Sequence, residues 1–166
     1  MLLESSMEQM LSKIEQFIKS NLIHSEYEHT PDQLDQKLKI ATAVLFLEMA
    51  YTDFNLDPEE EVQISKTMNE LFGLDPEEIT NLIEIAKEER ENQTDIWTFA
   101  GLIKSNFTRE QKIDIIEKLW TLIYTDGKLD KFENQLIHKI SNLLGLEHGE
   151  MIAAKIKIQK MLNIEY

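Results

Sequence analysis

Acidic side chains recur at matching positions in two parts of the sequence. Residues 51–60 read Tyr-Thr-Asp-Phe-Asn-Leu-Asp-Pro-Glu-Glu, and residues 124–133, which lie 73 positions later, read Tyr-Thr-Asp-Gly-Lys-Leu-Asp-Lys-Phe-Glu. We name them the first and the second acidic segment; six of their ten aligned positions are identical. Carboxylates can ligate hard divalent cations or pair with basic surfaces. The repetition predicts two copies of one helix–loop–helix unit, each carrying such groups.

Two of the aspartates fit a structural role that needs no ligand. Asp57 and Asp130 each stand three residues before a glutamate, Glu60 or Glu133, at the expected start of a helix. In such a capping box the aspartate accepts a hydrogen bond from the amide of the glutamate, which reaches back to the amide of the aspartate. The cap stabilises a helix by about 0.5–2 kcal/mol. We therefore expect capping here, with metal binding by these carboxylates as the alternative.

Asp53 and Asp126 are placed differently, because each follows the carboxyl end of an apolar helix. A negative charge there opposes the helix dipole and costs about 0.3–1 kcal/mol when exposed. Its presence in both segments calls for a compensating interaction. Two interpretations remain open: an Asx-turn with backbone amides two residues on, or a ligand for a hard cation or a basic partner.

Glu48 is the only charged residue between Ile40 and Tyr51, in a stretch that is apolar enough to form a buried helix. A buried carboxylate needs a partner. The sequence leaves two interpretations: a salt bridge to a lysine or arginine of another helix, or membership of the same acidic site as Asp53.

Other catalytic and metal-binding patterns are incomplete. Asp53, Asn55 and Asp57 match the first, third and fifth positions of an EF-hand loop, but Pro58 and Ile64 occupy the positions that need glycine and glutamate. The chain has no cysteine, and its four histidines, which we expect to be exposed or in a linker, lack zinc-protease spacing. Neither a G-x-S-x-G nor a P-loop pattern is present. The sequence predicts no catalytic residue.

The elements that must position these groups are helices. Apolar residues recur at helical spacing between helix-start signals, without the alternation typical of strands. Each of the 3 prolines fits the first turn of a helix. We predict an all-α fold of about eight helices, with two related helix–loop–helix halves. The expected N-caps are Thr30, Asp57, Asp75, Thr108 and Asp130, with Thr94 as a weaker sixth start.

An N-terminal amphipathic helix and a polar linker are expected over residues 1–30, followed by one helical domain over residues 31–166. The halves of that domain are expected at about 31–92 and 93–166. The first helix carries an apolar stripe, which must pack on the domain or on a second copy of the chain, so an oligomer formed through it is one expected arrangement. The stripe consists of Leu3, Met7, Met10, Ile14 and Phe17.

The net charge of −14, from 17 basic and 31 acidic residues, restricts the partners. It leaves no basic face for a nucleic-acid backbone or an anionic membrane surface. A protein partner with a basic surface is the expected complement. No apolar stretch is long enough to span a membrane, and the N-terminus lacks the features of a signal peptide. We therefore expect a cytoplasmic location.

The stretch from Ala50 to Glu60 carries the pattern A-x-x-D-x-x-L-D-x-x-E. This pattern and its apolar helix resemble the tellurite-resistance TerB-like family, over roughly residues 37–160. The stretch from Trp97 to Lys155 is similar to an uncharacterised bacterial branch of that family. The resemblance implies an all-helical fold and an acidic site that holds a divalent cation. Carried over by position, this site would use Asp53, Glu60, Asp126 and Glu133, with Asp57, Asp130 and Glu48 as further candidates.

These observations leave three hypotheses for the function. The first is a non-enzymatic TerB-like domain that binds Ca²⁺, Mg²⁺ or Mn²⁺, a basic partner, or both, through the paired acidic loops; the resemblance links it to tellurite or stress responses. The second is a metal-assisted hydrolase in which the same carboxylates hold the ion and activate water. The third is a structural helical adaptor without a metal. We favour the first hypothesis.

Overall fold

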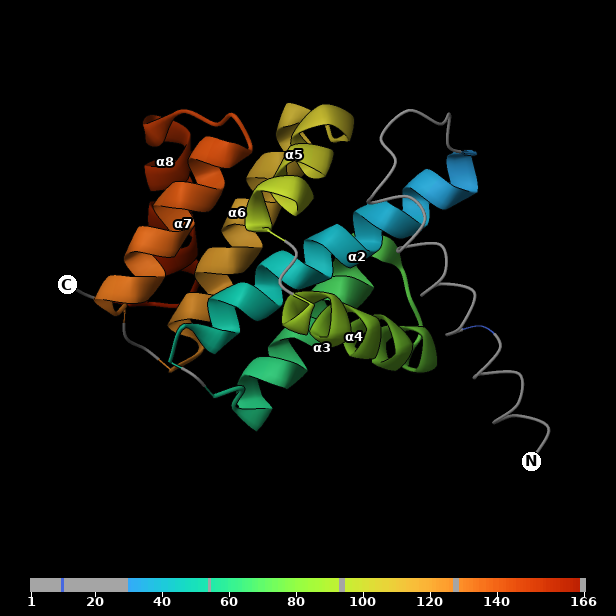
Figure 1. Ribbon diagram of the computed structural model, residues 1–166. Helices are drawn as coiled ribbons and strands as arrows, with labels where there is room; N and C mark the ends of the chain where they lie inside the picture. Colours follow the sequence, from blue (N-terminus) through green and yellow to red (C-terminus); the bar gives the residue numbers. More distant parts are fainter. Residues whose placement is uncertain (1–9, 11–29, 54, 93–94, 127–128, 165–166) are drawn as a thin grey trace.

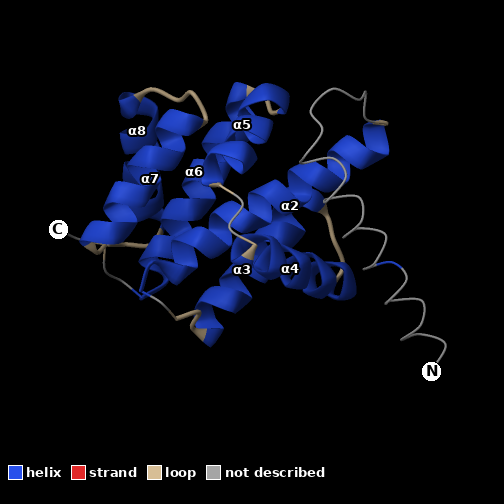
Figure 2. Ribbon diagram, viewed as in Figure 1, coloured by secondary structure: helices blue, strands red, loops and turns tan. Residues whose placement is uncertain are grey.

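The computed structural model describes residues 10, 30–53, 55–92, 95–126 and 129–164, and most of them are helical (Figure 1). This part of the chain contains no strand, as Figure 2 shows. The all-α fold predicted from the sequence is confirmed. The element order is α2 (Pro31–Ala50), η1 (Tyr51–Asp53), α3 (Pro58–Phe72), α4 (Pro76–Glu91), α5 (Ile96–Asn106), α6 (Arg109–Ile123), η2 (Tyr124–Asp126), α7 (Lys131–Leu143) and α8 (His148–Met161), where η denotes a 3₁₀ helix.

Most helices begin where the sequence supplies a preferred cap. The five main predicted N-caps are all observed, at the starts of α2, α3, α4, α6 and α7; they are Thr30, Asp57, Asp75, Thr108 and Asp130. Thr94, the weaker sixth start, lies outside the described residues. The N-cap of α5 is Asp95, which accepts from the Trp97 amide at 3.1 Å. Glu147 is the N-cap of α8. That start was missed because glutamate is not among the preferred N-cap residues.

Helix α2 is the central element of the fold. It contacts α3, α4, α5, α6 and α7, and in Figure 1 it runs across the middle of the molecule. From Ile40 to Ala50 every residue except Glu48 is buried. A helix that is apolar on all sides must lie inside a fold, which is how this stretch was interpreted from the sequence.

The carboxyl ends of α2 and α6 lie at the same end of the molecule, toward the lower left of Figure 1. Each of them continues into a single 3₁₀ turn, η1 or η2, before the next helix begins. The contacts are crossed, because α3 touches η2 and α6 whereas α7 touches η1 and α2. The two acidic segments are therefore adjacent, and each packs against helices of the other.

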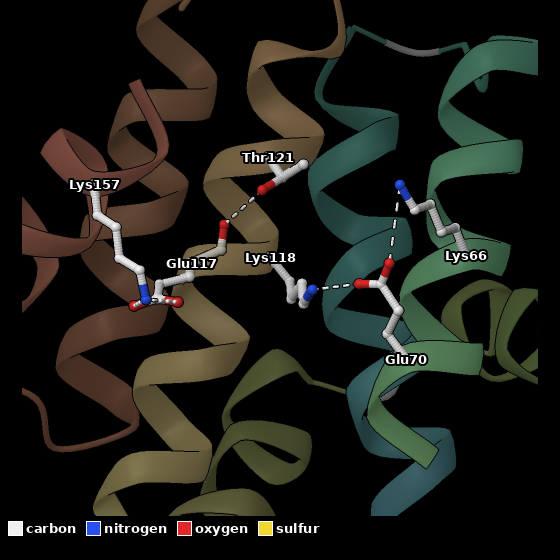
Figure 3. Close-up of polar contacts among 6 residues, drawn as sticks. All are labelled: Lys66, Glu70, Glu117, Lys118, Thr121 and Lys157. Atoms are coloured by element: carbon white, nitrogen blue, oxygen red, sulfur yellow. Dashed lines mark hydrogen bonds and ion pairs between the residues drawn. The ribbon is translucent and has the colours of Figure 1, made fainter. Parts of the chain in front are cut away.

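Ion pairs connect α6 to a helix on each side (Figure 3). Lys118 donates to Glu70 of α3, which also lies 3.9 Å from Lys66. The neighbouring Glu117 pairs with Lys157 of α8 at 3.0 Å. Surface pairs of this kind contribute at most about 1 kcal/mol each. The main contribution to packing comes from the continuous apolar core beneath them.

Most of the predicted N-terminal helix lies outside the described residues, and so does the linker that was expected to follow it. Of its apolar stripe only Met10 is described. Met10 lines a cavity of about 90 Å³ together with Ile40 of α2 and Leu82 and Ile85 of α4. Among the described residues, none of the helices combines the length and the apolar character that a membrane crossing requires.

Candidate metal or partner site

The two acidic segments follow the same local path. Tyr51 and Tyr124 end their helices with nearly identical dihedral angles, φ −83° and ψ 7° for the first and φ −84° and ψ 6° for the second. The next residue in each segment, Thr52 or Thr125, donates to a carbonyl of the preceding helix, at 3.0 and 3.2 Å. The matching sequences thus adopt a matching backbone where each helix passes into its 3₁₀ turn.

The helix that follows each segment is capped as predicted, although the two caps differ in tightness. In the second segment the Glu133 amide donates to Asp130 Oδ1 at 2.8 Å, and the Asp130 amide donates to Glu133 Oε1 at 3.2 Å. In the first segment the Asp57 amide donates to Glu60 Oε1 at 3.4 Å, which is long for a hydrogen bond. The second capping box is therefore the better formed one.

A cavity of about 20 Å³ lies between the two segments. Its polar wall comes from both of them and includes three of the seven carboxylates predicted as metal ligands. A cavity needs roughly 10–15 Å³ to hold one water, so this one accommodates a single ion or water and no organic substrate. The lining residues are Thr52 and Glu60, Asp130 and Glu133, and the apolar Ala50, Leu122 and Ile123.

The carboxylates of this cavity differ in their exposure to solvent. Glu133 is buried, with 9% of its surface exposed. Glu60 is half-buried, whereas Asp130 is exposed. Glu60 and Glu133 both interact with other groups of the fold. A carboxylate as buried as Glu133 keeps its charge only where hydrogen bonds or a cation replace the lost water.

The other predicted ligands of the acidic site lie elsewhere or are only partly described. Asp53 and Asp126 have their backbones in η1 and η2, but their side chains lie outside the described part of the structure. Asp57 is exposed and is not part of the cavity wall. Among the side chains that are described, no group of three or more His, Cys, Asp and Glu is arranged to hold a metal ion. The metal role of these residues stays a prediction.

Glu48 pairs with a cation of another helix, which is one of the two interpretations that its position allowed. Its Oε1 lies 2.9 Å from Nε of Arg90 in α4, and the Arg90 guanidinium lies 4.1 Å from the centre of the Tyr51 ring. All three side chains line a surface groove of about 320 Å³, as does Phe132, which is 65% exposed. Thr52 lines both this groove and the acidic cavity, so the two are adjacent.

Thr52 and Arg90 were not singled out from the sequence. Thr52 could have been, because an identical threonine occupies the matching position of the second segment. Arg90 carried no such signal, because its partner Glu48 lies 42 residues earlier and only the packing of α4 on α2 brings them together.

Comparison with known families gives one match. The family model described as tellurite resistance protein TerB matches residues 39–156, which is 118 of the 166 residues. The matched range contains both acidic segments and all seven predicted ligands. Comparisons with curated proteins and with solved structures gave no match. Because the matched range covers more than half of the chain, the protein belongs to the TerB family.

Proposed function

We propose that this TerB domain is non-enzymatic and binds a hard divalent cation between its two acidic segments. The observation that carries the proposal is that Glu60, Asp130 and Glu133 line one cavity with room for a single ion. The polar atoms of its side-chain wall are all oxygens, and the chain has no cysteine. Such a donor set fits Ca²⁺, Mg²⁺ or Mn²⁺ better than softer metals.

The negative charges of the cavity wall also support a bound cation. Carboxylates drawn from two segments into one small space repel each other, and a divalent cation relieves that repulsion. In the proposed site Glu60 and Glu133 would hold the ion, one from each segment, and Asp130 would lie beside it. Asp53 and Asp126, which begin the loops that precede these helices, would complete the donor set.

A basic group of a protein partner is the second candidate occupant. The first turn of α3 presents three consecutive glutamates, and two of them, Glu59 and Glu61, are exposed. The adjoining groove offers the exposed Phe132 for apolar contact. A partner could therefore direct a cationic side chain toward the acidic segments and an apolar one into the groove. In either form, binding at this place would be the contribution of the chain to the tellurite or stress response that its family suggests.

The dimensions of the cavity favour binding over catalysis. A metal-assisted hydrolase needs an open position for substrate beside its ion, and about 20 Å³ does not provide that space. We therefore assign no reaction to these carboxylates. The structural adaptor without a metal remains the outcome if no ion binds.

Thermal unfolding of the full chain in chelator, and then in millimolar Ca²⁺, Mg²⁺ or Mn²⁺, tests the proposal. An ion at a hundred times its dissociation constant stabilises the native state by about 2.7 kcal/mol. For a chain of this length that corresponds to a rise of roughly 5–11 °C in Tm. If no ion raises Tm by more than about one degree, the metal proposal fails.

Two double variants locate the ion. Glu60→Gln with Glu133→Gln should abolish the rise in Tm while the protein stays folded, because a glutamine already closes the capping boxes of α2 and α6. Asp53→Asn with Asp126→Asn should also abolish it. The matched control is Asp75→Ala, which removes a cap of α4 that does not line the cavity. This control should lower Tm equally with and without the ion.

A further inference from the structure

Two histidines that the acidic site does not use lie against each other between α7 and α8. His138 belongs to α7, and His148 is the first residue of α8. Their ring centroids are 5.6 Å apart, and the ring planes are inclined by 35°. His138 is half-buried and His148 is exposed, so solvent reaches the pair. Neither residue lines the acidic cavity.

The backbone fixes which nitrogen of His138 is available to a ligand. Nδ1 of His138 lies 2.6 Å from the carbonyl oxygen of Asn134, one turn earlier in α7. A carbonyl only accepts hydrogen bonds, so Nδ1 carries the proton and donates. In the neutral ring Nε2 then keeps its lone pair. Histidine ligands of metals are commonly oriented in this way, with the other ring nitrogen bonded to a carbonyl.

The separation of the rings matches the span of one bound ion. With metal–nitrogen bonds of about 2.0–2.1 Å and a near-tetrahedral angle, two imidazoles on one ion have ring centroids about 5–5.5 Å apart. The observed 5.6 Å is within a few tenths of an ångström of that range. A rotation of the exposed His148 side chain can supply the difference without moving either helix.

We propose that His138 and His148 form a second metal site, which binds a borderline divalent transition metal such as Zn²⁺, Ni²⁺ or Cu²⁺. Imidazole nitrogen suits these ions, whereas Ca²⁺ and Mg²⁺ select oxygen. Because the described part of the chain has no cluster of three or more His, Cys, Asp and Glu side chains suited to a metal, the two imidazoles are its protein ligands and water fills the remaining positions. The site is open and exchangeable, and it does not depend on the acidic cavity.

The surroundings of the pair favour a cation in spite of the adjacent helix end. The amino end of α8 carries a partial positive charge that would repel a metal ion. Glu147, the N-cap of α8, carries a negative charge in the same turn, whereas the carboxylate of Glu150 is already paired with Arg109 of α6. The carboxylate of Glu147 offsets part of the charge of the helix end. The net charge of −14 also raises the local concentration of cations.

Titration of the full chain with Zn²⁺, followed through the imidazole nitrogen resonances, tests the proposal. Millimolar Mg²⁺ is kept present throughout so that oxygen sites are occupied. We expect Nε2 of His138 and one nitrogen of His148 to shift together, while Nδ1 of His138 stays protonated. The other two histidines, His24 and His29, serve as internal controls. If only those two respond, or if His138 and His148 do not move, the proposal is wrong.

Single variants separate this site from the acidic one. His148→Gln removes an exposed ligand and should weaken Zn²⁺ binding by at least about tenfold, and His138→Gln should do the same. Both variants should keep the Tm response to Ca²⁺, Mg²⁺ or Mn²⁺ expected of the acidic cavity. Loss of that response, or Zn²⁺ affinity equal to wild type in both variants, would contradict a two-histidine site. Failure of either metal proposal is thus recognised independently of the other.

Discussion

The two acidic segments share their sequence and their backbone path, yet they are held in the fold by different neighbours. The second segment has a capping box with bonds of 2.8 and 3.2 Å and a buried Glu133. The first has a 3.4 Å bond and a half-buried Glu60. The same local sequence therefore determines the turn, whereas tertiary packing determines how firmly that turn is closed.

The tyrosine that opens each segment shows the same contrast. Tyr124 is buried, stacks on Trp120 with ring centroids 5.9 Å apart, and receives a hydrogen bond from Gln159 at 2.8 Å. Tyr51 is half-buried beneath the guanidinium of Arg90. The second tyrosine is thus part of the core between α6 and α8, and the first belongs to the wall of a groove. Accordingly, we expect the second segment to be the more stable one.

The largest loss of stability should follow from truncating Trp120, which stacks on Tyr124 of the second segment. Trp120 is fully buried, and its Nε1–H donates to the Met151 carbonyl at 3.2 Å. Trp120→Ala should lower the free energy of unfolding by about 3–5 kcal/mol, measured by urea denaturation. The matched control is Leu47→Ala, at the equivalent buried position of α2. A smaller loss for Trp120→Ala than for the control would contradict the proposed difference between the segments.

Removing the two aspartate caps tests whether the capping box of α7 contributes more stability than that of α3. Asp130→Ala should cost up to about 2 kcal/mol, because it breaks the 2.8 Å bond to the Glu133 amide. Asp57→Ala should cost nearer to about 0.5 kcal/mol, because the cap of α3 lacks a well-formed hydrogen bond to the Asp57 side chain. Chemical denaturation in the presence of chelator measures both values without any contribution from a bound ion. Equal losses would show that the two caps are equivalent in solution.

The helix starts were predictable because the residues that form a helix cap lie within four consecutive positions of the sequence. Asp75 and Thr108 identified their helices without any knowledge of the fold. The start at Glu147 was missed because its residue type rarely caps helices. The apolar stretch before Tyr51 likewise predicted a buried helix, because it is apolar on all sides.

The arrangement of the candidate site depended on contacts that no local pattern contains. Two equivalent loops can lie together or at opposite ends of a molecule, and only the crossed packing of α3 on η2 and α7 on η1 brings Glu60 and Glu133 to one cavity. The choice of Arg90 as the partner of Glu48 also required the position of α4. The local sequence therefore identified the acidic residues, whereas only the family resemblance grouped Glu60 and Glu133 in one site, and the structure adds that Asp130 lines the same cavity.

A smaller loss of stability is expected from removing the ion pair between Glu48 and Arg90, which lies beside the first segment. Arg90→Ala should cost about 1 kcal/mol, because it removes both the pair with Glu48 and the contact with the Tyr51 ring. Glu48→Gln removes only the pair and should cost less. A double-mutant cycle on urea denaturation gives the coupling of the two side chains directly. A coupling of zero would mean that the groove wall is held by apolar packing alone.

The smallest loss of stability should come from breaking the ion pairs that connect α6 to α3 and α8. The hydrogen bond from Lys118 lowers the pKa of Glu70 from its ordinary value of 4.5, with further contributions from the charges of Lys118 and Lys66. A lowered carboxyl pKa adds stability that is complete above pH 4.5 and is lost as the pH falls through the folded-state pKa. At neutral pH Glu70→Gln should therefore be less stable than wild type by an amount near the low end of about 0.2–1 kcal/mol, since the side chain is partly exposed.

This difference between wild type and Glu70→Gln should shrink as the pH is lowered below 4.5, and molar salt should reduce it at neutral pH. Lys157→Met, which breaks the pair with Glu117 on the other side of α6, is the matched control. It tests whether α6 is connected equally to α3 and to α8. Urea denaturation of the three proteins at neutral and acidic pH measures these effects. A loss for Glu70→Gln that stays constant from neutral pH to well below 4.5 would show that the charge of Glu70 does not hold α3 against α6.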